Sequence, residues 1–585
     1  MGVARRPLDY ELVTQAEPEV DAIQRDTQTI RGTTRKTRRW MTFALAFTLA
    51  LTLCLALNYV TGNTSSFHSP NRHLSNTTCS CSPTPSVPQY FQTTPELWAG
   101  PTPTGNAAFL AQTRTWQGDY IPNSPLQTAV PIPGSEPNQK SIFQMMGYLS
   151  PYTPSPGFGV DEFPLPRDAE ILQVQMLSRH GARYPTSGAN VMEFAERIAK
   201  AKGKGDVQFS EELDFLSGWE YALGGETLVP KGRMELFESG VLHAYMYGGL
   251  YNPGSKIIVR TTTQDRMLKS AENFLAGFFG LEWTRNATVE VIIEERGFNN
   301  SLAGDLNCPN AGRLKGGTKA AMEWIGLYLK NATERLNAMA DGYEWTLDDT
   351  YAAQTMCPYE TVAYGYSKFC ELFTHDEWKG FEYSVDLWFH GDFSFASPTG
   401  RAVGIGYQQE VLARLNNHTL GYSGSQINVT LDNNTDTFPL NQTLYFDFSH
   451  DTTIIAILTA FGLKQFSTPL DPTVHPGDHN FTVTHLTPFG ARLDIEIIRT
   501  PKPLAADRSS YLDGASTKYI HFILNQRTIP LGLSLPGCDA SRVDGWCEMS
   551  AFLKEQKKMP DLARFQEACY RDYPLDAKVE DGAPP

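Results

Sequence analysis

The sequence predicts an α/β fold, and three observations support this prediction. From about residue 166 onward, strand-like and helix-like patterns alternate along the chain, as they do in proteins that pack helices against a sheet. Three segments in this region repeat one order: an apolar run, a short polar turn and a helical pattern. The turns carry charged and imidazole side chains, which suit the ligand sites that α/β sheets form at the carboxyl ends of their strands.

The first of these segments begins with the apolar run Ile171–Leu177, which is typical of a buried strand. The turn after it has the sequence SRHGARYPTSG. A helix then follows, because apolar residues recur at i, i+3, i+4 and i+7, namely Val191, Phe194, Ala195 and Ile198. We therefore expect this turn to lie at the carboxyl end of a strand.

The other two segments follow the same order. In the second, residues 256–259 lead through RTTTQDR into a helix whose apolar face carries Met267, Ala271, Phe274, Leu275 and Phe278. In the third, residues 443–448 lead through SHDTT into residues 454–463, which are apolar on all sides and are expected to form a buried helix. Because such turns gather at one edge of a sheet, we expect the three turns to meet in one site.

The turn at residues 179–185 has the composition of a phosphate site. Arg179 and Arg183 each offer a planar fork of donors that suits phosphate oxygens, and His180 offers a nucleophilic nitrogen between them. Gly181 lets the backbone approach a ligand closely. A bare RHG string also occurs in solvated loops, so the preceding strand and the second arginine decide in favour of a phosphate site.

The other two turns supply the remaining candidate residues. Arg266 begins a predicted helix, where the dipole and free N–H groups favour an anion; a surface pair with Asp265 is the alternative, and Arg260 is a rival for the same role. His450 and Asp451 directly follow a strand. A carboxyl group beside bound phosphate can stay protonated at acidic pH and donate to the leaving oxygen, whereas a surface hydrogen bond or helix cap is the alternative.

Composition and motif spacing argue against several other functions. The net charge of -15 does not supply the broad basic surface that nucleic acid requires. Residues 312–319 lack the GK[ST] ending of a phosphate-binding P-loop, and residues 421–424 lack the GxSxG spacing of a serine hydrolase. The chain has no CxxC pair and no HExxH, so zinc is a weak alternative and we expect neither a metal nor another cofactor.

An uncharged stretch at residues 40–60 has the length of a membrane-spanning helix. The basic run at 35–39 precedes it, so the positive-inside rule places residues 1–39 in the cytosol, as a tail without regular structure. A cleaved signal peptide is the alternative, but 39 residues are long for its charged region and no clear cleavage site follows. We therefore expect a single-pass type II membrane protein with an extracellular or lumenal catalytic domain.

Glycosylation sequons support this topology, because all of them follow the apolar stretch. The ten candidates are Asn63, Asn76, Asn286, Asn299, Asn331, Asn417, Asn428, Asn433, Asn441 and Asn480. Cys54 lies within the stretch, and the other eight of the nine cysteines follow it, an even number that suggests disulfides in an oxidising compartment. Short local loops would be closed by two pairs, Cys357–Cys370 and Cys538–Cys547. The partners of Cys79 and Cys81 stay open, because a bridge between residues so close is strained.

The chain divides by composition into six parts. Residues 1–39 are the tail, 40–60 the membrane anchor and 61–88 a stalk rich in Ser, Thr, Pro and Asn. Residues 89–165 form an irregular extension rich in Pro and Gly. The catalytic domain is expected over residues 166–575, followed by a tail at 576–585.

The chain resembles the histidine acid phosphatases, and within them the branch that contains the secreted phytases. The string RHGARYPT at 179–186 is the first motif of that branch, and FSHD at 448–451 is the second. Further similar strings are CELFTHDEW at 370–378, TFPLNQTLYFDFSHD at 437–451 and HFILNQRTIPL at 521–531. The resemblance runs from about residue 90 to 569.

This resemblance implies a histidine phosphatase (phosphoglycerate-mutase-like) fold, with a large α/β domain, a smaller mainly helical domain and no required metal. It implies that His180 is the nucleophile, that Asp451 is the proton donor and that the phosphoryl group is bound by Arg179, Arg183, Arg266 and His450. It also implies a third disulfide, Cys308–Cys569.

The expected function is that of an acid phosphatase, and phytate is one expected substrate. The chain differs from the phytases at Thr452, where they carry Asn, and around 385–393, where WFHGDF replaces a segment that brings lysines toward the substrate. A broad range of phosphate monoesters is therefore a second expectation. A non-catalytic cell-surface glycoprotein that uses this fold to bind a ligand is the alternative from another class.

Overall fold

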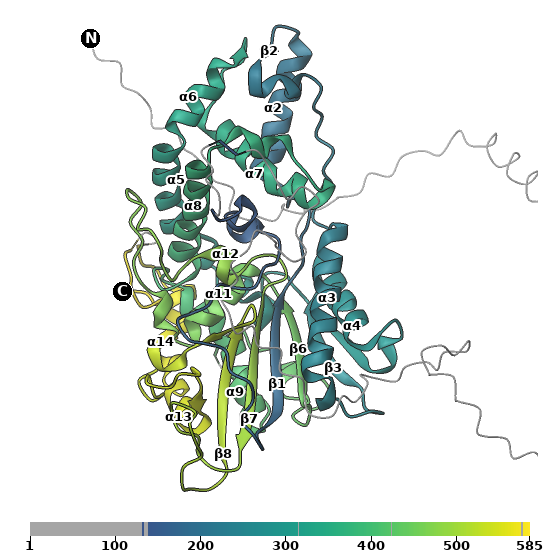
Figure 1. The fold of residues 1–585 in the computed structure, drawn as a ribbon, viewed down its shortest axis with the longest axis vertical. Coiled ribbons are helices and arrows are strands. Elements are labelled where there is room, and N and C mark those ends of the chain that lie inside the picture. Colours follow the sequence, from purple (N-terminus) through teal and green to yellow (C-terminus); the bar gives the residue numbers. More distant parts are fainter. Residues whose placement is uncertain (1–131, 134–138, 314, 423, 575–576) are drawn as a thin grey trace, which may run out of the picture. The chain divides into compact units, whose positions relative to one another are not determined.

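The computed structural model of the protein describes residues 132–133, 139–313, 315–422, 424–574 and 577–585. An eight-stranded sheet lies at its centre, with the order β10-β8-β7-β1-β6-β3-β4 and with β9 paired to β8 beside this path (Figure 1). The strands are β1 (Glu170–Arg179), β3 (Ile257–Thr262), β4 (Ala287–Ile292), β6 (Leu444–Ser449), β7 (Arg492–Thr500), β8 (Thr517–Leu524), β9 (Arg527–Ile529) and β10 (Cys547–Glu548).

Strand β1 lies where the parallel and antiparallel halves of this mixed sheet meet. It pairs in parallel with β6, with Val174 opposite Leu444 and Arg179 opposite Ser449, and β6, β3 and β4 continue in parallel. On its other side β1 pairs antiparallel with β7, and β8 and β10 continue antiparallel. The three strands predicted from the repeated pattern are therefore neighbours in the order β1-β6-β3, and their carboxyl ends share one edge.

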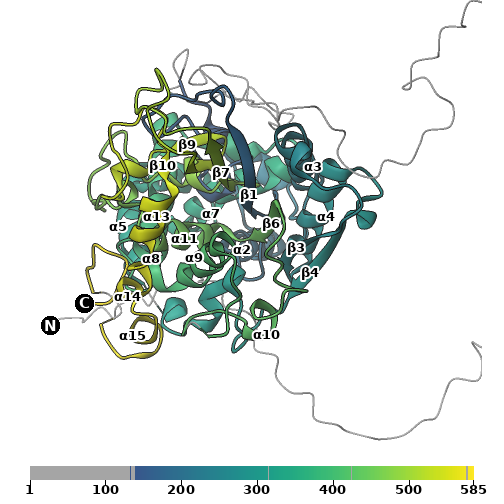
Figure 2. The ribbon, with the colours of Figure 1, turned by 90° about the horizontal axis from the view of Figure 1, so that it is seen from below.

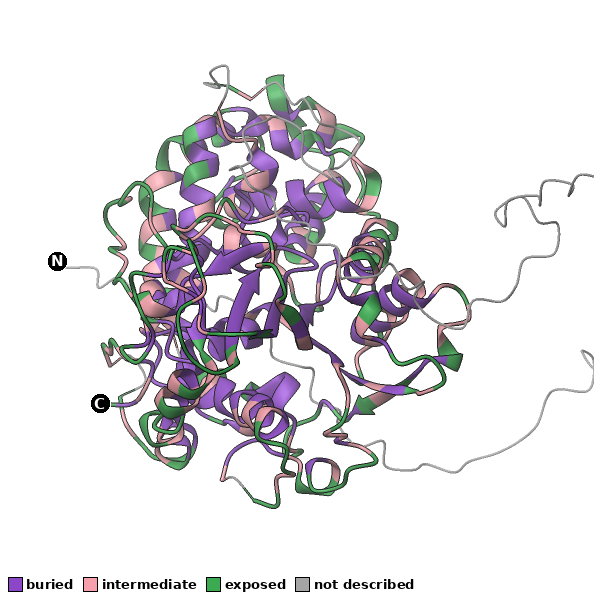
Figure 3. Ribbon diagram, turned by 60° about the horizontal axis from the view of Figure 1, so that its bottom comes forward, coloured by how far each residue is buried: buried purple, intermediate pink, exposed green. Residues whose placement is uncertain are grey.

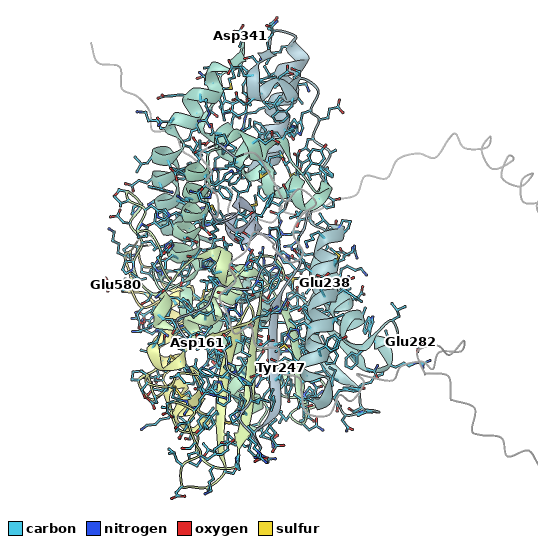
Figure 4. All side chains as sticks on the ribbon, in the orientation of Figure 1. Asp161, Glu238, Tyr247, Glu282, Asp341 and Glu580 are labelled. Atoms are coloured by element: carbon cyan, nitrogen blue, oxygen red, sulfur yellow. A yellow bond between two sulfur atoms is a disulfide. The ribbon has the colours of Figure 1, made fainter. Side chains whose placement is uncertain are left out.

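Helices cover both faces of the sheet, as expected of an α/β fold (Figure 2). On one face, α3 (Pro230–Tyr247) and α4 (Asp265–Phe279) share a core with β1, β3 and β6. A Cβ at Gly240 would lie 2.0 Å from the Phe274 carbonyl oxygen, and one at Gly277 would lie 2.0 Å from that of Phe237. These glycines allow the two helices to cross closely. Tyr247, labelled in Figure 4, donates a hydrogen bond of 2.8 Å from α3 to Glu496 of β7.

The other face is covered by α9 (Gly400–Asn416) and α11 (Asp451–Ala460). Helix α11 contains residues 454–460 of the run predicted as a buried helix over 454–463, and its residues from Thr453 to Ala460 are buried. Figure 3 shows the central strands mostly in the colour of buried residues, with exposed residues on the outer helices and loops.

A helical region adjoins the sheet beyond the carboxyl ends of its parallel strands (Figure 1). It contains α2 (Asn190–Lys204), α5 (Gly316–Tyr328), α6 (Lys330–Ala338), α7 (Leu347–Tyr364) and α8 (His375–Phe393). A two-stranded sheet of β2 (Gln208–Phe209) and β5 (Ala340–Asp341) belongs to it. Helix α2 packs against α7 and therefore belongs to this region. The strand that precedes α2 in the chain, β1, lies in the large sheet.

Shorter helices complete the described elements. The α-helices are α10 (Val429–Asp432), α12 (Val483–Leu486), α13 (Met549–Gln556), α14 (Met559–Ala563) and α15 (Phe565–Tyr570). The 3-10 helices are η2 (Ile142–Gln144), η3 (Gly147–Leu149), η4 (Glu211–Ser217), η5 (Gly248–Leu250), η6 (Trp283–Arg285), η7 (Ser301–Asn307), η8 (Ala311–Arg313), η9 (Lys368–Leu372), η10 (Lys464–Phe466) and η11 (Leu531–Leu533).

Both segments that flank the predicted catalytic domain pack against it where they are described. In the extension, Met146 and Leu149 are fully buried beside α8 and α12. In the C-terminal tail, Asp581 forms an ion pair with Arg401 at 2.6 Å, and the Gly582 amide donates to Phe395 O at 2.7 Å. The tail thus lies along the start of α9.

Three disulfides join the described cysteines, and they are the pairs that the sequence and its resemblance suggested: Cys308–Cys569, Cys357–Cys370 and Cys538–Cys547. Cys79 and Cys81 lie outside the described residues, as do the predicted membrane span, the stalk, and the sequons at Asn63 and Asn76. Within the described part of the chain, no helix has the length and apolar character needed to cross a membrane.

The eight described sequons differ in exposure. Asn331, Asn417, Asn433, Asn441 and Asn480 are exposed, while Asn299 and Asn428 are half-buried. Asn286 is buried, its Nδ2 is enclosed without a hydrogen-bond partner, and its Oδ1 accepts from the Tyr251 hydroxyl at 3.0 Å. Nδ2 is the atom to which a glycan attaches, so glycosylation at Asn286 stays a prediction that this packing does not favour.

Candidate active site

The three predicted turns come together at the carboxyl ends of β1, β6 and β3. Arg179 is the last residue of β1, and His450 is the N-cap of α11 directly after β6. Arg266 is the second residue of α4, four residues after the end of β3. The His180 and His450 rings lie edge to face with centroids 5.7 Å apart. The parallel order of the three strands therefore assembles the candidate residues in one place.

His180 is buried and held in one orientation. Its Nδ1 lies 2.9 Å from the Gly181 carbonyl oxygen, and because a carbonyl only accepts, Nδ1 carries the proton. Its backbone is fixed at both ends, since its amide donates to Ser449 O and its carbonyl accepts from Gly490 N. The other ring nitrogen, Nε2, then carries the lone pair that a nucleophile needs.

The surroundings of His180 keep its ring neutral. Burial lowers the pKa of His180 well below the usual value, and the positive charges of Arg179, Arg266 and Arg183 lower it further. A neutral imidazole is the nucleophilic form. The same arginines that suit phosphate therefore also keep the histidine unprotonated in acid.

Arg179 is fully buried and its direction is fixed by backbone oxygens. Its Nη1 donates to Tyr148 O at 2.5 Å and to Thr487 O at 2.9 Å, and its guanidinium stacks on the Phe489 ring at 4.6 Å. Its Nη2 lies 2.5 Å from Asp451 Oδ2. Burial lowers the pKa of Arg179 to about 10, so the group remains charged at acidic and neutral pH.

Arg183 and Arg266 complete the cationic group. Arg183 Nη1 donates to its neighbour's carbonyl oxygen, Tyr184 O, at 2.9 Å, while its Nε is buried without a partner. Arg266 Nη1 donates to Glu226 Oε2 at 2.7 Å. Burial lowers the pKa of Arg266, and the nearby charge of Arg183 adds to that effect. Unsatisfied guanidinium nitrogens in a buried cluster suit an anion that has several oxygens.

Asp451 and His450 lie side by side at the start of α11. The Thr452 amide donates to Asp451 Oδ1 at 2.8 Å, which orients the carboxyl group so that Oδ2 faces Arg179. His450 Nε2 lies 3.0 Å from Glu294 Oε1, and Glu294 is a buried residue two positions after the end of β4. Three of the phosphate-binding candidates are thus paired with carboxylates: Arg179 with Asp451, Arg266 with Glu226, and His450 with Glu294.

Arg260, the rival of Arg266 in the sequence, lies in a different cluster. Its Nε donates to Asp447 Oδ1 at 2.7 Å and its Nη2 donates to Glu410 Oε2 at 2.5 Å, deep between β3, β6 and α9. Arg414 Nη1 donates to the same Asp447 at 2.7 Å. The guanidinium of Arg260 is therefore committed to a buried network that joins the sheet to α9.

Gly181 is required by close packing with α3. A Cβ at Gly181 would lie 2.2 Å from Gly232 O, and one at Gly232 would lie 2.0 Å from Ala182 O. Glu235 of the same helix accepts from the Ala182 amide at 2.8 Å. The sequence suggested close approach of a ligand as the reason for Gly181; the contact seen here is with the N-terminal turn of α3, which holds the motif loop.

Several residues of the site carry no local signal in the sequence. Glu226 lies in the loop before α3, Glu294 follows β4, and Tyr148 and Phe489 come from segments about 340 residues apart in the chain. Glu226 has a positive φ of 64°, and its Oε1 accepts from the Ser187 amide at 2.7 Å. Only the position of Glu294 after a strand of the sheet could have drawn attention to it. Among the described residues, no group of three or more His, Cys, Asp or Glu is arranged to hold a metal ion.

Comparisons with known proteins agree with this geometry. Residues 170–525 match the family described as the histidine phosphatase superfamily, branch 2. Phytase A of Aspergillus fumigatus is 31% identical over 406 residues, covering 67% of this chain and 83% of that protein. Phytase A of Aspergillus oryzae is 30% identical over 435 residues, covering 71% and 88%.

A solved structure has a similar fold. The crystal structure of the phytase from D. castellii superposes with a TM-score of 0.60 at 23% identity, covering 78% of this chain and 95% of that chain. At this identity the likeness concerns the fold alone.

Proposed function

Because the chain belongs to branch 2 of the histidine phosphatase superfamily, we propose that it is an acid phosphatase that hydrolyses phosphate monoesters through a phosphohistidine at His180. The observation that carries this proposal is the state of His180. Its Nδ1 proton is bound to Gly181 O, its pKa is lowered by burial and by three arginines, and its Nε2 is the free nucleophile among these cations.

The reaction takes place in two steps. His180 Nε2 attacks phosphorus, a P–N bond forms, the P–O ester bond breaks, and the leaving oxygen takes a proton from Asp451. Water then attacks the phosphohistidine, the P–N bond breaks, and inorganic phosphate and a neutral His180 are released. Asp451 accepts the proton of that water and returns to its initial state.

The arginines supply electrostatic stabilisation in both steps. Charge on the transferring phosphoryl group spreads over its three non-bridging oxygens, and fixed guanidiniums around them lower the energy of the transition state. The buried position of Arg179 and its carbonyl contacts mean that it does not need to reorganise during the reaction.

The proposed substrates are small phosphate monoesters, with phytate among them. Phytate is favoured because the relatives that cover most of this domain are phytases by name. A broad range of phosphate monoesters is favoured by two carboxylates, because Glu226 contacts Arg266 and Glu294 contacts His450. These carboxylates lower the net positive charge that a six-fold phosphorylated ring would meet.

The full chain should be assayed with p-nitrophenyl phosphate and phytate from pH 3 to 7, with and without a chelator. We expect acid-optimal activity that the chelator leaves intact and that His180→Ala lowers by about 10³-fold or more. His418→Ala is the matched control, because His418 is an exposed histidine outside the site. An acid-labile phosphoenzyme should be trapped by rapid quenching of the wild type.

Three results would count against this function. Equal activity of wild type and His180→Ala would exclude His180 as the nucleophile. Loss of activity with chelator would indicate a metal-dependent route. Absence of activity at every pH, together with specific binding of phosphate, would favour a ligand-binding glycoprotein.

We also propose that residues 40–60 anchor the chain in a membrane, with the catalytic domain extracellular or lumenal. The support is the uncharged stretch, its basic flank and the exposed sequons that follow it. Protease treatment of intact microsomes should leave the domain protected, and glycosidase should increase its mobility. Digestion of the domain in sealed vesicles would contradict this orientation.

A further inference from the structure

Glu294 is a buried carboxylate that no motif includes, and it is held rigidly beside His450. Its Oε1 lies 3.0 Å from His450 Nε2 and also accepts from Gln264 Nε2 at 2.6 Å. Its amide donates to Thr263 Oγ1 at 3.0 Å. The β3–α4 turn thus fixes both the backbone and the carboxylate of Glu294. The contact between His450 Nε2 and Oε1 does not have the alignment of a hydrogen bond.

The charges around His450 show why a carboxylate is needed there. His180 lies next to it, Arg266 lies beside Glu294, and Arg179 and Arg183 approach from the motif loop. Asp451 and Glu226 also carry carboxylates in this cluster, but Asp451 Oδ2 contacts Arg179 and Glu226 Oε2 contacts Arg266. Burial and the positive charges of these three guanidiniums lower the pKa of the neighbouring His180.

A phosphate ligand requires a donor from His450. A neutral imidazole has one N–H, and if that N–H faces Glu294, the opposite nitrogen presents a lone pair that repels phosphate oxygens. Only the protonated ring has a second N–H. We propose that Glu294 is a positioning residue that keeps His450 protonated and orients it, so that Nε2 faces the carboxylate and Nδ1 donates to the phosphoryl group.

Glu294 is suited to this role because it stays ionised in acid. Burial alone would raise its pKa, but the attraction of His450 and the charge of Arg266 outweigh burial and lower the pKa of Glu294. The carboxylate therefore remains a counter-charge for His450 over the acidic range. The inference rests on the proposed phosphatase function, since it assigns a role to Glu294 within the same site.

The test uses the full chain and three variants. Glu294→Gln removes the charge at nearly constant shape, and Glu294→Asp keeps it. Glu295→Gln is the matched control, because Glu295 is the exposed neighbour and its substitution changes the net charge equally. For each protein, kcat and KM for p-nitrophenyl phosphate and the inhibition constant of inorganic phosphate are measured from pH 3.5 to 7.5, with a melting curve to check folding.

We expect Glu294→Gln to weaken binding in a pH-dependent manner. At pH 6.5 its KM and phosphate inhibition constant should rise about tenfold, whereas near pH 4 they should stay within about twofold of wild type, because excess protons then charge His450 without help. The alkaline limb of kcat/KM should move down by about one pH unit. Glu294→Asp should recover most of the binding at pH 6.5, and Glu295→Gln should behave as wild type.

The outcomes separate this inference from the proposed function. A uniform rise of KM at every pH, or tighter phosphate binding in Glu294→Gln, would overturn the role of Glu294 while leaving His180-dependent phosphatase activity in place. If the wild type has no phosphatase activity, the role of Glu294 can still be tested by measuring the binding of inorganic phosphate by calorimetry. A pH-dependent loss of that binding in Glu294→Gln supports the inference without the reaction, and unchanged binding rejects it.

Discussion

Asp451 Oδ2 lies 2.5 Å from Arg179 Nη2, so the expected proton donor and a phosphate-binding arginine are in direct contact. Arg179 is fixed by Tyr148 O and Thr487 O, and Asp451 is fixed by the Thr452 amide. A phosphoryl group bound by Arg179 therefore has the carboxyl group of Asp451 beside it. Two residues more than 270 positions apart become one functional pair because β1 and β6 are adjacent and parallel.

Replacement of Asp451 should affect substrates according to their leaving groups. Asp451→Asn removes the proton donor, so kcat for an alkyl ester such as glycerol 2-phosphate should fall by about 10²- to 10⁴-fold. p-Nitrophenolate leaves without a proton, and kcat for its ester should fall by about tenfold or less. Steady-state kinetics on both esters measure the difference. Equal losses on the two esters would show that Asp451 is not the general acid.

The pH profile should reflect the lowered pKa of His180. Burial and the arginines hold this pKa well below its ordinary value, so the nucleophile stays neutral as the pH falls. The acid limb of kcat/KM should therefore lie well below pH 6.5, the region of a free imidazole.

The folded state also binds fewer protons at His180 than the unfolded chain does, so acidification below about pH 6.5 costs stability through this residue. An acid limb near 6.5 would contradict the environment described for His180.

Release of Arg266 from Glu226 should strengthen phosphate binding. Glu226 Oε2 lies 2.7 Å from Arg266 Nη1, and the Glu226 side chain is half-exposed, so the pair is screened by water. Glu226→Gln should lower the inhibition constant of inorganic phosphate by up to about fivefold, with kcat little changed. Glu220→Gln, an exposed site in the preceding segment, is the control. Weaker phosphate binding in Glu226→Gln would instead indicate that Glu226 orients Arg266 for its ligand.

The long-range disulfide should stabilise the fold more than a local one. Cys308–Cys569 closes a loop between residues 261 positions apart, whereas Cys538–Cys547 closes a loop between residues 9 positions apart. By chain entropy, replacing the first pair with alanines should cost about 3 kcal/mol more free energy of unfolding than replacing the second. Urea unfolding of the two double variants measures this difference. Similar losses for both would show that chain entropy does not dominate here.

Local patterns in the sequence determined a large part of this structure. The apolar runs and helical spacings placed β1, β3 and β6 and the helices α2, α4 and α11 close to their observed bounds. The strings around His180 and Asp451 predicted the chemistry, because arginine forks, an imidazole and a carboxyl group are the groups that phosphoryl transfer needs. Those signals are local, since each depends on a few adjacent residues.

Only the tertiary structure decided which residues surround these groups. The pairing of β1 with β6 on one side and β7 on the other set the mixed sheet, and it brought Phe489 against Arg179. The same packing sent Arg260 into the network with Asp447 and placed Glu294 against His450. Such contacts join segments far apart in the chain, and they depend on strand order and helix packing, which adjacent residues do not encode. The sequence alone therefore predicted the reacting groups, and the fold determined which charged residues surround and orient them.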